Sequence, residues 1–191
     1  MKVYFTAAIS AKDQFGKNYK AIVETLRELG HKVSADHILK RDMSFIKKET
    51  DEEHKKHYKW MVRELSKADL LIAEVSFPST VHVGHELTLA LEKDKPVLAL
   101  YTEKRKPLLF WGITSEKFYV AEYNLRNIKS VLEGSIDYLA EQMDARFNFF
   151  ISPKIGNYLD WIAKKRKMPR AVYLRRLIEK DMVMNKKYKK S

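Results

Sequence analysis

The sequence has no cysteine among its 191 residues. Disulfide bonds and cysteine-ligated zinc are therefore excluded, and the composition is compatible with a reducing compartment. No run approaches the roughly 18 apolar residues that a membrane-spanning helix needs. The opening MKVYFTAAIS lacks the apolar core and cleavage pattern of a signal peptide. We therefore expect a cytoplasmic protein that does not use a membrane.

Positive charge is concentrated at one end of the chain. Residues 145–191 hold 14 of the 37 lysines and arginines but only 3 of the 25 acidic residues, so this last quarter carries +11 of the net charge of +12. The first 144 residues are nearly neutral. This asymmetry predicts two modules with different partners.

Apolar runs alternate with helical patterns over residues 1–143, which we expect to form the first domain. We expect strands at 2–8, 31–34, 70–75, 95–101 and 117–123, helices near 19–29, 51–67, 83–93 and 126–143, and an irregular segment at 35–50. Such alternation predicts an α/β fold with a flavodoxin-like, doubly wound parallel sheet. Ligands of these sheets bind outside the carboxyl ends of the strands, so residues 4–10, 76–86 and 101–102 should surround one cleft.

A single carboxylate, Glu86, follows the buried strand in ADLLIAEVSFPSTVHVGHE, residues 68–86. Together with VYFTAAI at 3–9, LRELGHKV at 26–33 and KPVLALY at 95–101, this stretch resembles the nucleoside 2-deoxyribosyltransferase superfamily. The most similar branch is the 2'-deoxynucleoside 5'-phosphate N-hydrolases. The resemblance implies a nucleoside or nucleotide substrate and cleavage of its N-glycosidic bond.

The resemblance also implies roles for five residues. Glu86 would act as a nucleophile or would stabilise positive charge at the anomeric carbon. Gly84 would let the backbone approach the ligand, and Ser79 would bind phosphate or a sugar hydroxyl. Tyr4 would line the same site, and Ser10, in its first loop, would bind the substrate. Neither a metal nor another cofactor is implied.

Three positions depart from the superfamily pattern. Ala8 and Ser10 stand where a serine and an arginine follow the first strand, which weakens the case for a 5'-phosphate substrate. Met61 stands where an aspartate precedes the AD pair. Nearby acids that could substitute for that aspartate are Asp51, Glu52, Glu53 and Glu64.

Plainer interpretations remain for the charged groups. Glu86 alone could be a solvated acid at a helix N-terminus, where the dipole favours negative charge. Glu74 is expected to be structural, and DEEHKKH at 51–57 is expected to be a charged helix face. His82 and His85 could reach the cleft or be incidental.

The segment RFNFFISPKIGNYLDWIAKKRKMPRAVYLRRLIEKDM, residues 146–182, predicts a short strand and two helices joined by the basic turn 164–167. So small a unit cannot bury a sufficient core alone, which predicts a second copy as partner. It resembles the ribbon-helix-helix DNA-binding family, in which two chains pair their strands and the ribbon enters the major groove. We therefore expect residues 144–191 to form a small ribbon-helix-helix unit and the protein to be a homodimer or higher even oligomer.

Strand alternation divides the side chains of this expected ribbon into two sets. One set, Phe147, Phe149 and Ile151, would face the core together with apolar stripes on the two helices. The other set, Arg146, Asn148 and Phe150, would face DNA, and Arg170 would contact phosphate at the second helix. The alternative is a basic hairpin that packs on the sheet or only mediates dimerisation.

Three functional hypotheses follow from these two modules. The first is an N-glycosidic hydrolase or deoxyribosyltransferase that uses Glu86. The second is a catalytically impaired, ligand-sensing DNA-binding regulator, which Ala8, Ser10 and Met61 favour. The third is an enzyme whose C-terminal unit only dimerises it.

Overall fold

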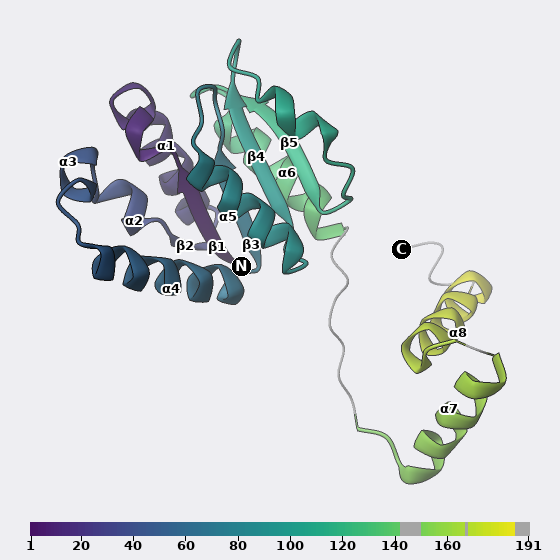
Figure 1. Ribbon diagram of the computed structural model, residues 1–191. Coiled ribbons are helices and arrows are strands. Elements are labelled where there is room, and N and C mark those ends of the chain that lie inside the picture. The colour runs from purple at the N-terminus through teal and green to yellow at the C-terminus, as the bar shows by residue number, and fades with distance from the viewer. Residues whose placement is uncertain (142–149, 167, 186–191) are drawn as a thin grey trace. The chain divides into compact units, whose positions relative to one another are not determined.

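The chain forms two compact units, Met1–Asp144 and Ala145–Ser191. The computed structural model describes residues 1–141, 150–166 and 168–185. Figure 1 shows the elements of both units.

Five parallel strands form the sheet of the first unit, in the order β2-β1-β3-β4-β5. This order confirms the doubly wound α/β fold, and it places a switch point between β1 and β3. The strands at the centre are buried along nearly their whole length, as strands covered on both faces must be. The bounds are β1 Lys2–Ala7, β2 Lys32–Ser34, β3 Leu70–Glu74, β4 Val97–Thr102 and β5 Phe118–Tyr123.

Helices cover both faces of this sheet (Figure 1). One layer contains α1 (Lys12–Glu28) and α6 (Ile128–Glu141), and the other contains α4 (Asp51–Lys67) and α5 (Val81–Glu92). The shorter elements are η1 Ile9–Ala11, α2 Asp36–Leu39, α3 Met43–Ile46 and η2 Leu108–Gly112. Within the described residues, no helix has the length and apolar character needed to cross a membrane.

The alternation of side chains along β1 decides which groups reach the α4–α5 layer. Val3, Phe5 and Ala7 pack into the core shared with α1 and α6. Since successive strand residues point to opposite faces, Tyr4 and Thr6 point toward α4 and α5. The sheet thereby presents two hydroxyl groups to the face that carries Glu86.

The segment at 35–50 was expected to be irregular, and this expectation was wrong. It contains α2 and α3, and the Lys12 ammonium donates hydrogen bonds to the carbonyl oxygens of Leu39 and Arg41, at 2.7 and 2.6 Å. Asp42 caps α3 by accepting a hydrogen bond from the Phe45 amide at 2.9 Å. Helices of four residues are too short to produce an apolar period, so the sequence pattern did not reveal them.

The helix that carries Glu86 begins two residues earlier than expected. Thr80 is the N-cap of α5, and its hydroxyl accepts a hydrogen bond from the Val83 amide at 3.5 Å. Glu86 therefore lies in the second turn of α5, where it projects from a formed helix and not from the helix start.

The second unit is a hairpin of α7 (Pro153–Arg166) and α8 (Arg170–Met184). Its buried core consists of Leu159, Ile162 and Tyr173. The basic run expected as a turn at 164–167 instead supplies the last turn of α7 through residues 164–166, because lysine and arginine are good helix formers.

The expected ribbon strand is described only in part. Arg146 and Asn148, with Phe147 and Phe149, lie outside the described residues. Phe150 and Ile151 belong to no strand, and Phe150 is fully exposed. A ribbon strand pairs only with its copy in a second chain, so a single chain offers it no hydrogen-bonding partner.

Several side chains that were expected to face inward in this hairpin are exposed in the single chain. They are Ile155, Tyr158, Leu177, Ile178 and Met182, whereas Leu159 and Ile162 are buried and Leu174 is partly buried. The hairpin thus keeps an apolar surface that its own two helices do not cover.

We predict that Ile72→Ala will lower the free energy of unfolding of the first unit by about 2–5 kcal/mol. Ile72 is fully buried on β3, between Phe5 of β1 and Leu98 of β4, so truncation leaves a cavity. Urea unfolding followed by circular dichroism measures the change. The control Leu109→Ala removes an exposed side chain and should cost less than about 0.5 kcal/mol; equal losses would contradict the assigned core.

Candidate functional site

A cavity of about 730 Å³ lies at the carboxyl end of the sheet, beside the switch point. Ala7 and η1 line it after β1, residues of the α2–α3 segment and α4 line its sides, and α5 supplies the wall that follows β3. Its volume is in the range of small-molecule sites. A smaller hollow of about 330 Å³ lies among Lys2, Lys32 and Lys67 and contains none of the expected site residues.

Glu86 contributes a carboxylate to the wall of this cavity. Its Oε2 atom is enclosed and makes no hydrogen bond of normal geometry with a described residue. Burial raises the pKa of the carboxyl group to about 7, and the nearby hydroxyls of Thr6 and Tyr4 oppose part of that rise. Glu86 is therefore not a solvated helix-start acid, and it can change its ionisation near neutral pH.

Tyr4 lies under Glu86 on the sheet. It is fully buried, its hydroxyl lies near the Glu86 carboxylate without a hydrogen bond of normal geometry, and its ring stacks on His37 with 4.9 Å between centroids. Burial and the Glu86 charge raise the pKa of Tyr4 far above neutrality. The phenol therefore stays protonated and can donate a hydrogen bond to the Glu86 carboxylate. Tyr4 itself, expected to line the site, is not among the residues that line the cavity.

Buried polar atoms without partners gather around the cavity. Among the described residues, these atoms belong to six side chains: Tyr4, Thr6, His37, Arg41, Ser79 and Glu86. Three of these side chains line the cavity, Tyr4 and Thr6 face Glu86, and Ser79 precedes a lining residue. Buried polar groups without partners are costly and uncommon, so these atoms are positions that water or a polar ligand can satisfy.

Five of the six histidines line the same cavity: His37, His54, His57, His82 and His85. Burial lowers the pKa of His37 to about 3, with a further contribution from His57 and Arg41. Burial also lowers the pKa of His57, again reinforced by Arg41. These two rings are neutral at physiological pH, and each offers one donor and one acceptor.

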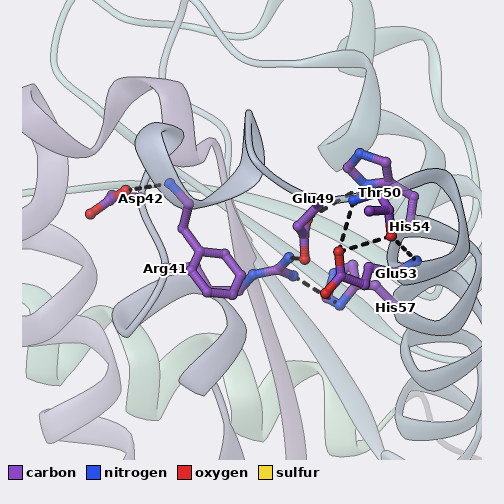
Figure 2. Close-up of polar contacts among 8 residues, drawn as sticks. Arg41, Asp42, Glu49, Thr50, Glu53, His54 and His57 are labelled. Carbon is purple, nitrogen blue, oxygen red and sulfur yellow. Dashed lines mark hydrogen bonds and ion pairs between the residues drawn. The ribbon is translucent and has the colours of Figure 1, made fainter.

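Arg41 lines the cavity and makes polar contacts with two other lining residues, Glu49 and His57 (Figure 2). Its Nη2 pairs with Glu49, and its Nη1 lies 3.0 Å from Nδ1 of His57. Since a guanidinium group only donates hydrogen bonds, Nδ1 of His57 must accept, and the proton of the neutral ring resides on Nε2. Glu49 also lies 3.4 Å from Nδ1 of His54.

The structure brings the expected site residues together to different degrees. Ser10 lines the cavity from η1, as does Met61 from α4. The Ser79 hydroxyl is buried without a partner. Gly84 is not among the lining residues, and a Cβ atom added there would meet no atom within 4 Å, so the chain itself does not require glycine at this position.

None of the acids considered as substitutes for the missing aspartate lines the cavity. Asp51 and Glu52 are exposed in the first turn of α4, and Glu53 is used in its capping box with Thr50. Glu64 pairs with Lys67 at 3.0 Å. The second carboxylate of the cavity is Glu49, which the sequence interpretation missed.

Glu74 is structural, as expected. It is buried at the end of β3, accepts a hydrogen bond from the Ser76 hydroxyl and lies 3.3 Å from the Tyr123 hydroxyl. Ser76 in turn accepts a hydrogen bond from the Thr102 amide at 2.9 Å. These contacts tie the loop after β3 to the end of β4.

The sequence interpretation also missed the roles of His37, Arg41, His54 and His57. The run at 51–57 was expected to be a charged helix face, but His54 and His57 line the cavity. A signal was present, because positions 54, 57 and 61 recur on one face of α4 at helical spacing. Within the described ranges, no group of three histidine or acidic side chains is placed to hold a metal ion.

We predict that Glu86→Gln will change how stability depends on pH. The pKa of a free glutamate is near 4.5, and that of Glu86 is about 7. The contribution of Glu86 protonation to the free energy of unfolding is therefore complete below pH 4.5 and is lost as pH rises through 7. The free energy of unfolding of the variant minus that of the wild type should therefore increase as pH rises from 4.5 to 8. The total increase should be no more than roughly 3 kcal/mol. Urea unfolding across this range measures the difference. Glu92→Gln, on an exposed position of the same helix, is the control, and identical pH curves for wild type and Glu86→Gln would contradict the burial.

Comparison with known proteins assigns the first unit to a family. No family model matches the chain. "Putative 2'-deoxynucleoside 5'-phosphate N-hydrolase 1" of Thermofilum pendens is 32% identical over 145 residues, which are 72% of this chain and 99% of that protein. The protein of the same name from Nematostella vectensis is 31% identical over 69% of this chain and 90% of its own length.

A solved structure shares the fold. The 2-deoxyribosyltransferase from Bacillus psychrosaccharolyticus superposes with a TM-score of 0.52 and 17% identity, over 68% of this chain and 90% of that one. The identity to these sequence relatives and the share of them that is covered show that the chain belongs to the 2'-deoxynucleoside 5'-phosphate N-hydrolase family.

Proposed function

We propose that the first unit cleaves the N-glycosidic bond of a nucleoside or nucleotide, with Glu86 as nucleophile or charge stabiliser. The observation that carries this proposal is the enclosed carboxylate of Glu86 in a cavity whose buried polar groups lack partners. The names of the sequence relatives, 2'-deoxynucleoside 5'-phosphate N-hydrolase, support the same reaction type.

The reaction breaks the bond between the anomeric carbon and the base nitrogen. The bonding electrons leave with the base, and positive charge develops on the sugar. An ionised Glu86 would stabilise this charge or bond to the anomeric carbon, after which water would supply the hydroxyl group to the sugar and a proton to the base. The hydroxyls of Tyr4 and Thr6 lie beside the carboxylate and would orient it.

The pKa of Glu86 imposes a condition on this mechanism. Only the ionised carboxylate carries the required charge, and half of the free enzyme holds it at a pH of about 7. The value of kcat/KM should therefore rise with pH through 7, in the opposite direction to the stability contribution of the same group.

The second candidate function of this unit is ligand sensing without turnover. Met61 occupies the cavity wall where the superfamily resemblance implies an aspartate, and no other acid except Glu49 joins Glu86 among the described lining residues. Binding without release of free base would favour this alternative.

We predict that the wild-type chain will release free base from at least one 2'-deoxynucleoside or 2'-deoxynucleoside 5'-monophosphate. Glu86→Gln should lower kcat on the order of 10³-fold, because it removes charge stabilisation at the reacting carbon. Chromatographic quantification of the base measures both rates, with Glu92→Gln as the control. Binding of these compounds without any cleavage would contradict the proposed hydrolysis and favour ligand sensing without turnover.

For the second unit, we propose dimerisation as a ribbon-helix-helix and binding of DNA through residues 146–182. Two features favour this proposal: the net charge of +11 in residues 145–191, and the apolar side chains of α7 and α8 that remain exposed in one chain. Arg170 pairs with Asp160 of α7 at the start of α8, so it would hold DNA phosphate only while shared with that carboxylate.

DNA binding by this unit should weaken steeply as salt concentration rises. Each phosphate contact should contribute a slope of about −0.9 in log K against log salt, since counterions are released on binding. Arg146→Ala combined with Asn148→Ala should reduce the affinity for a selected site by about 10-fold or more. Fluorescence anisotropy measures both effects, with Lys20→Ala plus Lys47→Ala in the first unit as the control. Unchanged binding by the Arg146 and Asn148 variant would rule out readout by the ribbon.

A further inference from the structure

The first helix of the hairpin carries a second face beside the one that buries Leu159 and Ile162. Four exposed side chains recur there at helical spacing and define what we call the α7 stripe: Lys154, Tyr158, Trp161 and Lys165. Trp161 belongs neither to the expected ribbon nor to the apolar residues expected to form the core of the hairpin. The stripe is therefore a surface whose partner the hairpin itself does not supply.

Two aromatic rings form the centre of the α7 stripe. Trp161 is 53% exposed and Tyr158 is 49% exposed, and their ring centroids are 5.9 Å apart with 36° between the ring planes. The hydroxyl of Tyr158 lies 3.2 Å from that of the buried Tyr173, and this contact limits the motion of the Tyr158 ring. Tryptophan is mostly buried in folded proteins, so an exposed and positioned pair of rings indicates a contact surface.

A lysine lies at each end of the α7 stripe. The ammonium group of Lys165 lies over the Trp161 ring, 4.7 Å from its centroid, and Lys154 lies at the other end. Asp160, which is the one acidic residue of α7, pairs with Arg170. Neither lysine of the stripe forms an ion pair with a described carboxylate. Their positive charges are therefore available to an anionic partner.

The charge and the rings together fit one kind of partner. Residues 145–191 carry a net charge of +11, which is complementary to a chain of phosphates. A single strand of nucleic acid offers its bases for stacking on aromatic side chains and its phosphates to nearby cations. A duplex keeps its bases stacked on one another, so it offers these rings no base face. A helix that lies on a membrane needs a continuous apolar face, whereas lysines bound the α7 stripe at both ends.

We propose that the α7 stripe binds single-stranded DNA, with bases stacked on Trp161 and Tyr158 and with phosphates held by Lys154 and Lys165. The inference rests on the proposed function of this unit only for the choice of DNA as the partner. It uses neither the ribbon residues 146–150 nor a second copy of the chain. Because every base has a π face, the stripe should bind single strands with little sequence preference.

The test measures binding of a fluorescein-labelled oligothymidylate to the full chain by fluorescence anisotropy. Trp161→Ala should weaken binding about 5- to 100-fold, which is the usual loss when a stacking ring is removed. Trp161→Phe keeps a ring and should lose less affinity. A labelled strand of the same length without bases should bind more weakly than the oligothymidylate, and Trp161→Ala should leave its affinity unchanged.

Salt dependence separates the contribution of the lysines from that of the rings. Lys154→Gln combined with Lys165→Gln should reduce the slope of log K against log salt by up to about 1.4, since each lost phosphate contact contributes about 0.7 for a single strand. Trp161→Ala removes no charge and should leave the slope unchanged. Tyr138→Ala removes a half-exposed aromatic side chain of α6 in the first unit, and this control should change neither affinity nor slope. Thermal unfolding followed by circular dichroism shows whether each variant is folded.

The outcomes distinguish the α7 stripe from the duplex binding proposed above. If Trp161→Ala weakens the oligothymidylate but not a selected duplex, the stripe is a separate site. If, in addition, Arg146→Ala with Asn148→Ala leaves duplex binding unchanged, readout by the ribbon fails and the stripe stands. If Trp161→Ala weakens neither strand, weakens the strand without bases equally, or weakens the duplex equally, the inference is overturned and the ribbon proposal is unaffected.

Three other results would assign the stripe to a different partner. If Trp161→Ala leaves the oligothymidylate affinity unchanged but converts a dimer to a monomer in analytical ultracentrifugation, Trp161 belongs to an interface with a second copy. If the wild type binds anionic phospholipid vesicles but not the oligothymidylate, the stripe contacts a membrane surface. If it binds an oligouridylate but not the oligothymidylate, the partner is RNA. Each of these results overturns the assignment to single-stranded DNA.

Discussion

The burial of the Glu86 carboxylate at the switch point of the sheet is the constraint on which the site depends. An ionised carboxylate taken out of water is unfavourable unless polar groups or charges compensate it. Here the compensation is incomplete: two hydroxyls from β1 lie close, and Oε2 still has no hydrogen bond of normal geometry. The ionised Glu86 carboxylate would therefore be stabilised by a ligand that carries positive charge.

The fold explains why these groups meet. Side-chain alternation on β1 sends Tyr4 and Thr6 to the α4–α5 face, and parallel pairing with β3 brings the following loop and α5 over them. Arg41 and Glu49 from the 35–50 segment, together with His57 of α4, line the same cavity and contact one another (Figure 2). The cavity is therefore lined by the carboxylate of Glu86 and, from other elements, by the Arg41–Glu49 ion pair.

How far the sequence predicts this arrangement depends on the kind of signal. Long apolar runs predicted the parallel sheet, and a motif at 68–86 predicted Glu86, because hydrophobic patterning and a strand-loop-helix sequence are local features. Arg41 and Glu49 were not predicted, since they lie in the connections beside short helices, where there is no periodicity, and meet only through tertiary contacts. His54 and His57 were hidden within a charged run whose inward face is set by packing.

In the second unit, too, the sequence pattern predicts the helices but not the contacts that bury their apolar side chains. Its helices were predicted from apolar stripes, yet much of each stripe remains exposed in one chain. Whether those side chains become a core depends on a second polypeptide, which the sequence of one chain implies only through the shortage of buried residues.

The most direct test of the account is a crystal structure of the Glu86→Gln protein with a bound 2'-deoxynucleoside 5'-monophosphate. The account predicts that the anomeric carbon lies within the cavity, in contact with the side chain at position 86. A ligand bound elsewhere, or one whose sugar faces away from position 86, would contradict it.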